Sequence, residues 1–478
     1  MPGPLHQPPP DRDRFGRLTE AHLEFFRSVV GADYVLTDAD SRRHYGHDWT
    51  EDYSFPPEVV VKPATTEAVA AILRRCAADR LPVTPAGGRT GLSGGMLPVY
   101  GGVLLSLERM NRILELDTRN LQIVVQPGVV TQHIHEAAEA VGLSYPPDPS
   151  SKGSCLIGGN VAENAGGAHA VKYGITNAYV LALEAVLPSG EVIRTGARVL
   201  KNSTGYNLTQ LLTGSEGTLA VITEITLRLV PKPRHVQTLL APFADAQAAC
   251  DCVSALFRAG LQPSTLEFME RDALVFGQRY LGIDRYSVAG VEAHLLLEFD
   301  GNDAGAVLAD CETALGVLEA HGAHEVLLAQ SAEQQAELWR IRRCLGEAVK
   351  GTTIYKEEDT VVPRAELANL LRFVKQVGAE VGFQSVCYGH AGDGNLHVNI
   401  LRGELSDTVW HDELPKAIAR IFEYVVSLGG TLSGEHGIGW VQRPYMPIRF
   451  SATELALLRG IKQVFDPQGI LNPGKIFP

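Results

Sequence analysis

The chain has 478 residues and a formal net charge of −13, with 45% hydrophobic and 20% charged residues. This composition is that of an ordinary globular protein, and it excludes a largely disordered chain or a coiled coil. The length predicts two or three domains. The acidic balance disfavours general nucleic-acid binding, because phosphates would be repelled. No stretch of the sequence approaches the roughly 18–20 apolar residues of a membrane-spanning helix.

The first residues and the cysteines indicate in which cellular compartment the protein is expected. Met1–Arg17 is rich in proline and charge and lacks the apolar core of a secretory signal. We therefore predict a disordered tail and, by default, a cytoplasmic location, with a peripheral position at the inner face of a membrane left open. The seven cysteines are scattered and form no C-x-x-C pair. This favours buried free thiols over an iron–sulfur cluster or a cysteine-rich zinc site.

Apolar periodicity predicts the following elements in chain order. Before Pro231–Pro233, which resembles a domain boundary, helices are expected at 23–30, 65–79 and 131–141, and strands at 59–61, 81–84, 103–107, 113–116, 122–125, 180–188, 191–195 and 219–229. Beyond it, helices are expected at 244–259, 304–321, 330–348, 364–382 and 412–428, and strands at 294–300, 386–388 and 396–400. Long helices mixed with short strands predict an α+β domain with an antiparallel sheet.

The loop at 85–95 contains five glycines together with Arg89, Thr90 and Ser93. Glycines let backbone N–H groups turn toward one point and let an anion approach, which suits a pyrophosphate. The alternative is an ordinary glycine-rich surface loop. The sequence contains neither a Walker loop nor G-x-G-x-x-G, so a nicotinamide-binding Rossmann site is disfavoured. Two further glycine-rich stretches, 146–174 and 201–219, indicate a long ligand such as a dinucleotide.

The three loops together resemble the FAD-binding domain of the vanillyl-alcohol-oxidase flavoproteins. Within that superfamily the sequence is similar to the D-2-hydroxyacid dehydrogenase branch, which comprises D-lactate dehydrogenases, glycolate oxidase flavin subunits and D-2-hydroxyglutarate dehydrogenases. The segments that carry this resemblance are Ile157–Gly167, Thr213–Leu219, Gly389–His397 and Gly434–Gly437.

The resemblance implies an α+β fold with a PCMH-type FAD-binding domain and a substrate (cap) domain, whose antiparallel sheet is flanked by helices. The implied organisation is a disordered tail at 1–17, an N-terminal helical segment at 18–54, the FAD-binding domain at 55–232, the cap domain at 233–465 and a C-terminal return to the flavin at 466–478.

The resemblance also implies which residues contact the cofactor. It places FAD against Pro85, Gly87, Gly88, Arg89, Thr90, Gly91, Leu92, Ser93, Pro147, Asp148, Ser151, Gly158, Gly159, Asn160, Asn164, Gly166, Gly167, Gly174, Glu216, Gly217, Ile222 and Asn472. Relatives that bind FAD covalently often have a histidine in the first loop. The loop at 85–95 has none, so we expect non-covalent FAD.

Four polar residues near the C-terminus suggest a metal and a base. Residues seven apart in a regular strand face opposite sides, but glycines between His390 and His397 allow the chain to bend and the two rings to converge. Two imidazoles and a carboxylate suit Zn²⁺ or Mn²⁺. The alternative is a hydrogen-bonded polar turn without metal. The resemblance assigns His390, His397 and Glu435 to the metal, and it leaves His436 as the catalytic proton acceptor.

Two basic residues are candidates for binding the substrate carboxylate. Arg342 follows Trp339 in the pattern W-x-x-R, and Lys356 occupies the matching position on a predicted strand. Relatives bind carboxylate with such a pair, which suits the guanidinium fork. The alternative is ordinary surface charge, and the adjacent Arg340 and Arg343 leave the register of the arginine open. Relatives that act on D-2-hydroxyglutarate often have a threonine where this chain has Gly346. This difference weakens the case for a dicarboxylate substrate.

The sequence therefore predicts an FAD-dependent dehydrogenase that oxidises D-lactate, D-2-hydroxyglutarate or glycolate to the 2-oxo acid by hydride transfer to flavin N5. The alternatives are a metal-dependent hydrolase, which would leave the glycine loops unexplained, and a non-catalytic FAD-binding subunit of an oxidase complex, which would not need the histidines. The electron acceptor (a quinone, an electron-transfer flavoprotein or another molecule) and a homodimer are left open.

Overall fold

The computed structural model describes residues 11–50, 53–286 and 288–478. The chain forms two compact units: Met1–Ala165, Ile175–Lys232 and Glu435–Pro478 make up the first, and Gly166–Gly174 and Pro233–Gly434 the second. The chain thus returns to the first unit at Glu435, well before the boundary at 465 that the sequence suggested. The first ten residues of the expected tail lie outside the described residues.

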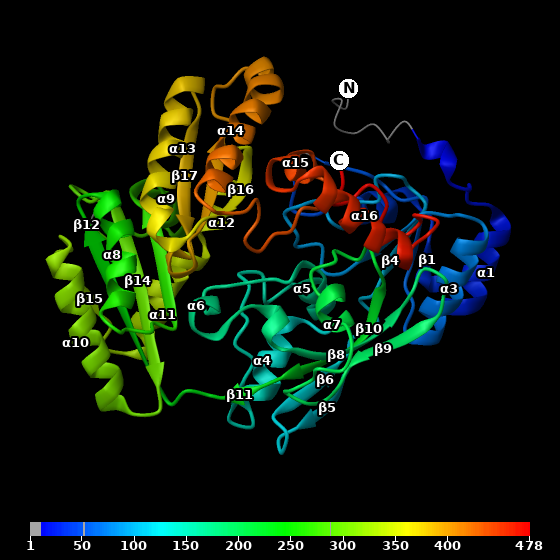
Figure 1. The fold of residues 1–478 in the computed structure, drawn as a ribbon, viewed down its shortest axis with the longest axis horizontal. Helices are drawn as coiled ribbons and strands as arrows, with labels where there is room; N and C mark the ends of the chain where they lie inside the picture. The colour runs from blue at the N-terminus through cyan, green and yellow to red at the C-terminus, as the bar shows by residue number, and fades with distance from the viewer. Residues whose placement is uncertain (1–10, 51–52, 287) are drawn as a thin grey trace. The chain divides into compact units, whose positions relative to one another are not determined.

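The first unit contains a four-stranded sheet in the order β1-β2-β4-β3. Its strands are β1 (Val35–Leu36), β2 (Val59–Val61), β4 (Val103–Ser106) and β3 (Val83–Ala86), of which the last three are parallel. Strands β2 and β4 are buried throughout, as continuous apolar runs in a parallel sheet require. Helices α1 (Glu20–Val30) and α3 (Thr66–Ala78) pack against this sheet (Figure 1).

A second sheet of the same unit has the order β5-β6-β10-β8-β9 and is antiparallel throughout. Its strands are β5 (Ile113–Asp117), β6 (Gln122–Val125), β10 (Val221–Arg228), β8 (Val180–Val186) and β9 (Val192–Gly196). The short strands β7 (Leu143–Ser144) and β11 (Val230–Pro231) pair separately. The remaining α-helices of this unit are α2 (Ala39–Tyr45), α4 (Thr131–Glu139), α5 (Ile157–Glu163), α7 (Leu208–Leu212), α15 (Met446–Arg449) and α16 (Ala452–Phe465).

Both ends of the described chain pack into the first unit. Phe15, which follows a 3₁₀ turn at Arg12–Arg14, is 5% exposed and belongs to the core around the four-stranded sheet. Ordered structure therefore begins before Leu18. At the other end, Ile470 and Leu471 are fully buried in the same core, and Leu471 forms a parallel bridge with Val83. Burial of these apolar residues explains why the C-terminal segment joins the first unit.

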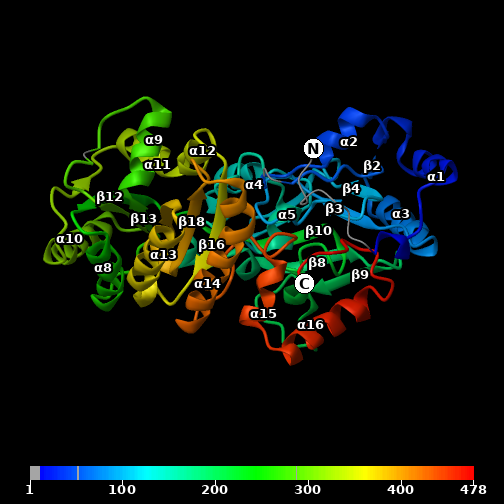
Figure 2. The same ribbon diagram turned by 90° about the horizontal axis from the view of Figure 1, so that it is seen from above.

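The second unit is built on one antiparallel sheet in the order β15-β12-β14-β13-β17-β18-β16. The strands are β12 (His235–Phe243), β13 (Thr265–Glu270), β14 (Ala293–Gly301), β15 (Leu327–Leu328), β16 (Tyr355–Val361), β17 (Gln384–Gly389) and β18 (Asn395–Leu401). The helices are α6 (Ala170–Tyr173), α8 (Ala246–Arg258), α9 (Arg271–Leu281), α10 (Ala304–Ala320), α11 (Ala332–Arg343), α12 (Leu345–Lys350), α13 (Leu367–Val381) and α14 (Leu414–Ser427). Figure 2 shows α8, α10, α13 and α14 on one face and α9, α11 and α12 on the other.

The α+β class predicted from the sequence is confirmed, but several elements differ from the expectation. The helix expected at 330–348 is two helices, α11 and α12, separated at Cys344. Strands β12 and β13 were not anticipated. β13 is buried over its whole length although it carries two glutamates, so it shows neither polar–apolar alternation nor an unbroken apolar run. Its place in the middle of the sheet is set by pairing with β14 and β17.

The state of the cysteines agrees with the expectation of buried free thiols. All seven cysteines are buried free thiols. In the part of the chain that the structure describes, no helix combines the length and apolarity that crossing a membrane requires.

The buried C-terminal segment predicts a difference between two leucines. Leu471→Ala removes a fully buried side chain from the core of the first unit, and we expect it to lower the free energy of unfolding by about 2–5 kcal/mol. Leu457→Ala on α16, where the leucine is 66% exposed, is the matched control and should change stability by less than about 0.5 kcal/mol. Urea denaturation of both variants measures the difference. Equal effects would contradict the packing described.

Candidate functional site

The first glycine loop follows strand β3, and several of its backbone N–H groups have no hydrogen-bond partner within the described chain. None of the N–H groups of residues 88–93 donates a hydrogen bond to a described residue. Arg89 has a positive φ of 61°, which turns the loop sharply. The hydroxyl of Ser93 is buried and likewise has no hydrogen-bond partner among the described residues. Such groups are the usual ligands of a phosphate.

The other two glycine stretches pack directly against this loop. A Cβ at Gly88 would lie 2.7 Å from the carbonyl oxygen of Ser154. A Cβ at Gly217, where φ is +63°, would lie 2.7 Å from Cγ of Pro85. Both contacts are too short for a side chain, so glycine is required at these positions for the loops to meet. Parts of the three stretches that the sequence suggested for one long ligand therefore meet in the first unit, around Gly88, Ser154 and Gly217.

The C-terminal segment ties these loops together through buried polar groups. The Nδ2 of Asn472 donates to the carbonyl oxygens of Gly95 and Glu216, both at 2.8 Å. The carboxylate of Glu216 accepts the N–H groups of Ile438 and Gly439 at 2.9 and 2.6 Å. Glu216 and Asn472 were predicted to contact FAD. Their side chains already have protein partners, so their evident role is to hold loops in place.

Other predicted FAD residues have identifiable protein partners as well. Asn160 is buried and its Nδ2 donates to Oγ1 of Thr131, whereas Asn164 has a left-handed conformation and its Oδ1 accepts the N–H of Asn177. The carbonyl oxygen of Pro147 lies 3.0 Å from Nε2 of His135. Asp148 forms an ion pair with Lys152. Gly166, Gly167 and Gly174 belong to the second unit. Contact of these residues with FAD stays a prediction.

Lys475 is a buried cation among buried carboxylates. Its Nζ donates to the carbonyl oxygen of Leu97 at 2.6 Å and to Oδ1 of Asn472 at 3.2 Å. Burial lowers the pKa of Lys475 to about 7, although Asp48 and Glu216 act in the opposite direction. Burial raises the pKa of Glu163, and the neighbouring Glu216 raises it further. The loops are thus supported by a charge cluster that is sensitive to pH.

The two histidines of the second unit converge as predicted. His390 follows β17, a 3₁₀ turn occupies Ala391–Asp393, and His397 lies in β18. Gly394 makes the turn: its φ is +77°, and a Cβ there would lie 2.0 Å from the carbonyl oxygen of Val362. The ring centroids of His390 and His397 are 5.4 Å apart. The prediction that glycines bend this segment is confirmed.

Strand register decides which side chains share the face of His397. In the pairing of β16 with β18, Asp359 is opposite His397, and Glu357 is opposite Asn399. Paired residues point to the same face of a sheet. The Nδ1 of His397 lies 3.5 Å from Oε1 of Glu357 and 3.6 Å from Oδ1 of Asp359. Two carboxylates therefore lie beside this histidine, and Asn399 shares its face of the sheet.

The same register corrects the prediction for Lys356. Lys356 pairs with Ile400 and therefore points to the face opposite His397, because successive residues of a strand alternate. Its ammonium lies 4.9 Å from the centroid of the buried Trp410 ring. The sequence-based assignment was off by one residue, and the position that faces the histidines carries the acidic Glu357.

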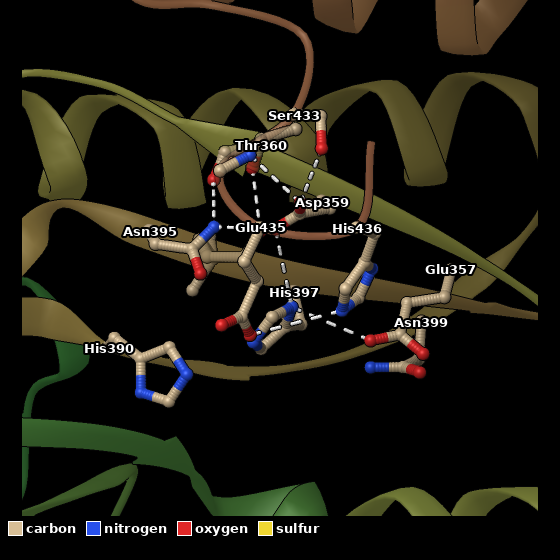
Figure 3. A network of polar contacts seen from close by, with 12 residues as sticks. Glu357, Asp359, Thr360, His390, Asn395, His397, Asn399, Ser433, Glu435 and His436 are labelled. Carbon is tan, nitrogen blue, oxygen red and sulfur yellow. Dashed lines mark hydrogen bonds and ion pairs between the residues drawn. The ribbon is translucent and has the colours of Figure 1, made fainter. Parts of the chain in front are cut away.

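Asp359 also anchors the segment that carries the remaining predicted residues. Its Oδ2 accepts the hydroxyl of Ser433 at 2.7 Å and the N–H of Gly434 at 2.8 Å, immediately before Glu435 and His436 (Figure 3). Nε2 of His436 lies 3.9 Å from Oε1 of Glu435. Asn395, whose Nδ2 donates to Oδ1 of Asp359, completes this anchor.

Two overlapping groups among the described residues have the composition of a metal site. One is His390, His397 and Glu435, as predicted; the other is Glu357, His397 and His436. Within each group the ligand atoms lie within 4.8 Å of one another. Imidazole nitrogen and carboxylate oxygen are donors that Zn²⁺ and Mn²⁺ accept, so the residues fit a divalent ion.

Arg342 is the buried member of its arginine cluster. It is 5% exposed, whereas Arg340 and Arg343 are exposed, which supports the register read from W-x-x-R. Its Nη2 lies 2.5 Å from Oε2 of Glu267. The two form an ion pair without hydrogen-bond geometry, and Nε and Nη2 of Arg342 have no hydrogen-bond partner among the described residues. Buried donors of this kind fit a carboxylate ligand.

Glu267 joins Arg342 to the histidines, and sequence reasoning missed it. Its side chain is fully buried, and Oε1 lies 2.7 Å from Nδ1 of His390. Burial by itself raises the pKa of Glu267, but Arg342 and then His390 outweigh it and hold the pKa below its usual value. Asn399 was missed too, although its place two residues after His397 on the same strand is a usable signal. Glu267 lies 123 residues from His390 in the sequence, and no sequence pattern indicated this contact.

Comparisons with known proteins agree with the loop geometry. Residues 57–196 match a family model described as an FAD binding domain, and residues 232–476 match the C-terminal domain of FAD linked oxidases. The structure resembles that of p-cresol methylhydroxylase with a TM-score of 0.78 at 17% identity, over 96% of each chain. This likeness supports the predicted flavoprotein fold.

Three curated relatives match over nearly their whole lengths. The D-lactate dehydrogenase of Anaerostipes hadrus is 38% identical and covers 97% of this chain and 98% of the relative. The glycolate oxidase subunit GlcD of Bacillus subtilis is 40% identical, over 96% and 97%. The D-2-hydroxyglutarate dehydrogenase of Stutzerimonas stutzeri is 35% identical, over 96% and 99%.

The buried lysine predicts a pH-dependent stability. The pKa of Lys475 is lowered from 10.5 to about 7 in the folded chain, so the unfolded chain binds more protons between these values. The free energy of unfolding should therefore rise with pH across this window, by up to about 1.4 kcal/mol per pH unit, and the contribution should be constant below pH 7. Lys475→Met should flatten the rise.

Urea denaturation between pH 7.5 and 10 measures the slope. Lys416→Met is the control, because the side chain of Lys416 is 70% exposed. Slopes that do not differ between wild type and Lys475→Met would contradict a shifted lysine.

Proposed function

The chain belongs to the family of FAD-linked oxidoreductases that includes D-lactate dehydrogenases, glycolate oxidase subunits and D-2-hydroxyglutarate dehydrogenases, and we propose that it oxidises a small D-2-hydroxy acid to the 2-oxo acid. The observation that carries this proposal is the gathering of two imidazoles and a carboxylate near a buried arginine. A hydroxy acid presents a hydroxyl and a carboxylate, and these are the two groups that such side chains bind.

The first unit is proposed to hold FAD non-covalently. The partnerless N–H groups of loop 88–93 and the hydroxyl of Ser93 would bind its pyrophosphate. The loop contains no histidine that could link to the flavin. When bound, FAD supplies the acceptor for the hydride that leaves C2 of the substrate. The parts of the other two glycine-rich stretches that lie in the first unit, residues 146–165 and 201–219, would orient the cofactor.

In the second unit and the segment after it, His390, His397 and Glu435 would hold a divalent ion. Such an ion, when bound, supplies a Lewis acid that lowers the pKa of the substrate hydroxyl. Nε2 of His436 would accept the hydroxyl proton, because a neutral imidazole is a suitable base near pH 7. Arg342 would hold the substrate carboxylate through the Nε side of its guanidinium, because Nη2 already lies 2.5 Å from Oε2 of Glu267.

The charges around the histidines favour a substrate with one carboxylate. The strand positions opposite His397 and Asn399 carry Asp359 and Glu357, and Lys356 points to the other face. Arg342 already has an ion-pair partner in Glu267. A second carboxylate on the substrate would therefore meet acidic side chains instead of a second cation. D-Lactate and glycolate fit this environment better than D-2-hydroxyglutarate.

Each of the two other candidate functions leaves part of the protein without a role. A metal-dependent hydrolase leaves the FAD-binding domain without a role. A non-catalytic subunit would not need the polar cluster, whose histidines, carboxylates and anchoring Asp359 are all present.

The proposal predicts that hydroxy acids reduce the bound flavin. Anaerobic mixing with D-lactate or glycolate should bleach the visible flavin band, and D-2-hydroxyglutarate should act more slowly. Chelation of divalent ions should slow bleaching while FAD stays bound, and Zn²⁺ or Mn²⁺ should restore the rate. L-Lactate is the control for stereochemistry. If none of the hydroxy acids bleaches the flavin of the metal-loaded protein, the proposed function is wrong.

The role of His436 makes a separate prediction. His436→Asn should slow flavin reduction by about 10²–10⁴-fold, the usual effect of losing a general base, while FAD and metal content persist. His411→Asn, which changes an exposed histidine, is the matched control. Stopped-flow bleaching and metal analysis provide the two readouts. A wild-type rate would exclude His436 as the base, whereas loss of metal would favour Glu357, His397 and His436 as the ligand set.

A further inference from the structure

Glu267 is shared by two buried side chains that the proposed function uses for different purposes. It lies in the middle of β13 and is fully buried. One carboxylate oxygen, Oε1, lies 2.7 Å from Nδ1 of His390, and the other, Oε2, lies 2.5 Å from Nη2 of Arg342. His390 is 6% and Arg342 5% exposed, so water does not screen either pairing effectively.

The contact with His390 determines which ring nitrogen carries the proton. An ionised carboxylate can only accept hydrogen bonds, so Nδ1 of His390 must be the donor. In the neutral imidazole the lone pair is then on Nε2, and this is the nitrogen that can bind a metal. A carboxylate behind a metal-binding histidine has this effect in many metal sites.

The contact with Arg342 determines where a buried positive charge lies. A guanidinium with so little exposure needs a counter-charge, because burying an unpaired ion is strongly unfavourable. Glu267 supplies that charge on one side of the guanidinium. Nε of Arg342 has no hydrogen-bond partner among the described residues.

We propose that Glu267 is a positioning residue that sets the metal-binding tautomer of His390 and the orientation of Arg342 together. The inference rests on the proposed function, since it assigns the metal to His390 and the substrate carboxylate to Arg342. Through this one side chain, metal binding and carboxylate binding are coupled.

Only a carboxylate of this length can serve both partners. In Glu267→Gln the amide has one oxygen and one NH₂ group. If the oxygen accepts from His390, the NH₂ group faces the guanidinium, and two donors meet. If the amide turns around, its NH₂ group donates to Nδ1 and moves the histidine proton to Nε2, where it blocks the metal. A neutral amide therefore satisfies either the histidine or the arginine, but not both.

Glu270 provides a matched control on the same strand. It is 7% exposed, and its carboxylate binds Nζ of Lys375 at 2.8 Å and the N–H of Cys387 at 2.7 Å. Glu267 and Glu270 are three residues apart and face opposite sides of the sheet. Glu270→Gln removes the same charge from the same buried strand, but it leaves the histidines and Arg342 untouched.

The experiment is a double-mutant cycle on the full-length FAD-loaded protein: wild type, Glu267→Gln, Arg342→Met and the double variant, with Glu270→Gln beside them. Zinc affinity is measured without substrate, by competition with a chromophoric chelator. The KM and kcat for D-lactate are measured separately with an artificial electron acceptor.

Glu267→Gln should lower zinc affinity about 10–100-fold and raise KM. Arg342→Met should raise KM but leave zinc affinity within a few-fold of wild type. The double variant should regain most of the zinc affinity, because the amide oxygen can then accept from His390 without opposing a guanidinium. Glu270→Gln should change neither quantity.

Two results would overturn the inference while leaving the proposed function intact. One is a wild-type protein that binds zinc and oxidises D-lactate, together with a Glu267→Gln variant that has the same zinc affinity and KM. The other is an equal loss in Glu267→Gln and Glu270→Gln, which would mark general damage to the strand. A wild-type protein that neither binds a divalent ion nor oxidises a hydroxy acid would instead reject the proposed function itself.

Discussion

Successive side chains of a β-strand point to opposite faces, and the candidate histidine site depends on this alternation. Strand β18 lies between β17 and β16, and its residues His397 and Asn399 point to the same face. Antiparallel pairing brings Tyr388, Asp359 and Glu357 to that face from the neighbouring strands. A slip of one residue in β16 would bring Lys356, Glu358 and Thr360 to this face in place of Glu357 and Asp359, so the hydrogen-bond register sets the charge around the histidines.

Two buried carboxylates hold the backbone on either side of Glu435 and His436. Asp359 is 3% exposed, and its oxygens accept from Ser433, Gly434 and Asn395. These bonds hold the backbone immediately before Glu435. Glu216 does the same at the other end of the segment, where it accepts the N–H groups of Ile438 and Gly439. The short stretch that carries Glu435 and His436 is thus held by a carboxylate on each side.

This arrangement gives an energetic reason for keeping charge in the interior. A buried ion pair is a weak source of stability, because desolvation offsets most of the Coulomb attraction. Removing one partner, by contrast, is strongly destabilising, so a buried charge accepts few alternative arrangements of its neighbours. Asp359, Glu267 and Glu216 limit the conformations of the loop, the histidine and the arginine in this way.

Local signals in the sequence were enough to predict much of the fold and part of the site. Strands β2 and β6 and the convergence of His390 with His397 follow from short apolar runs and from glycines between polar residues. The W-x-x-R pattern pointed to Arg342 but left Arg340 and Arg343 as alternatives, and only Arg342 is buried. What could not be predicted depends on pairing between distant segments. The place of β13 and the partners of Glu267 belong to this class.

Lys356 shows how a single residue of register changes the chemistry that a sequence suggests. The run Tyr355-Lys356-Glu357 contains a cation and an anion side by side, and only the pairing with β18 decides which one faces the histidines.

Two like charges about 4 Å apart repel by about 4 kcal/mol at an effective dielectric constant of about 20. A second substrate carboxylate that came this close to Glu357 would lose roughly a thousandfold in affinity. The methyl group of lactate or the hydrogen of glycolate would meet no such repulsion. Because Glu357 and not Lys356 faces the histidines, the register removes from this face the second cation that the sequence suggested.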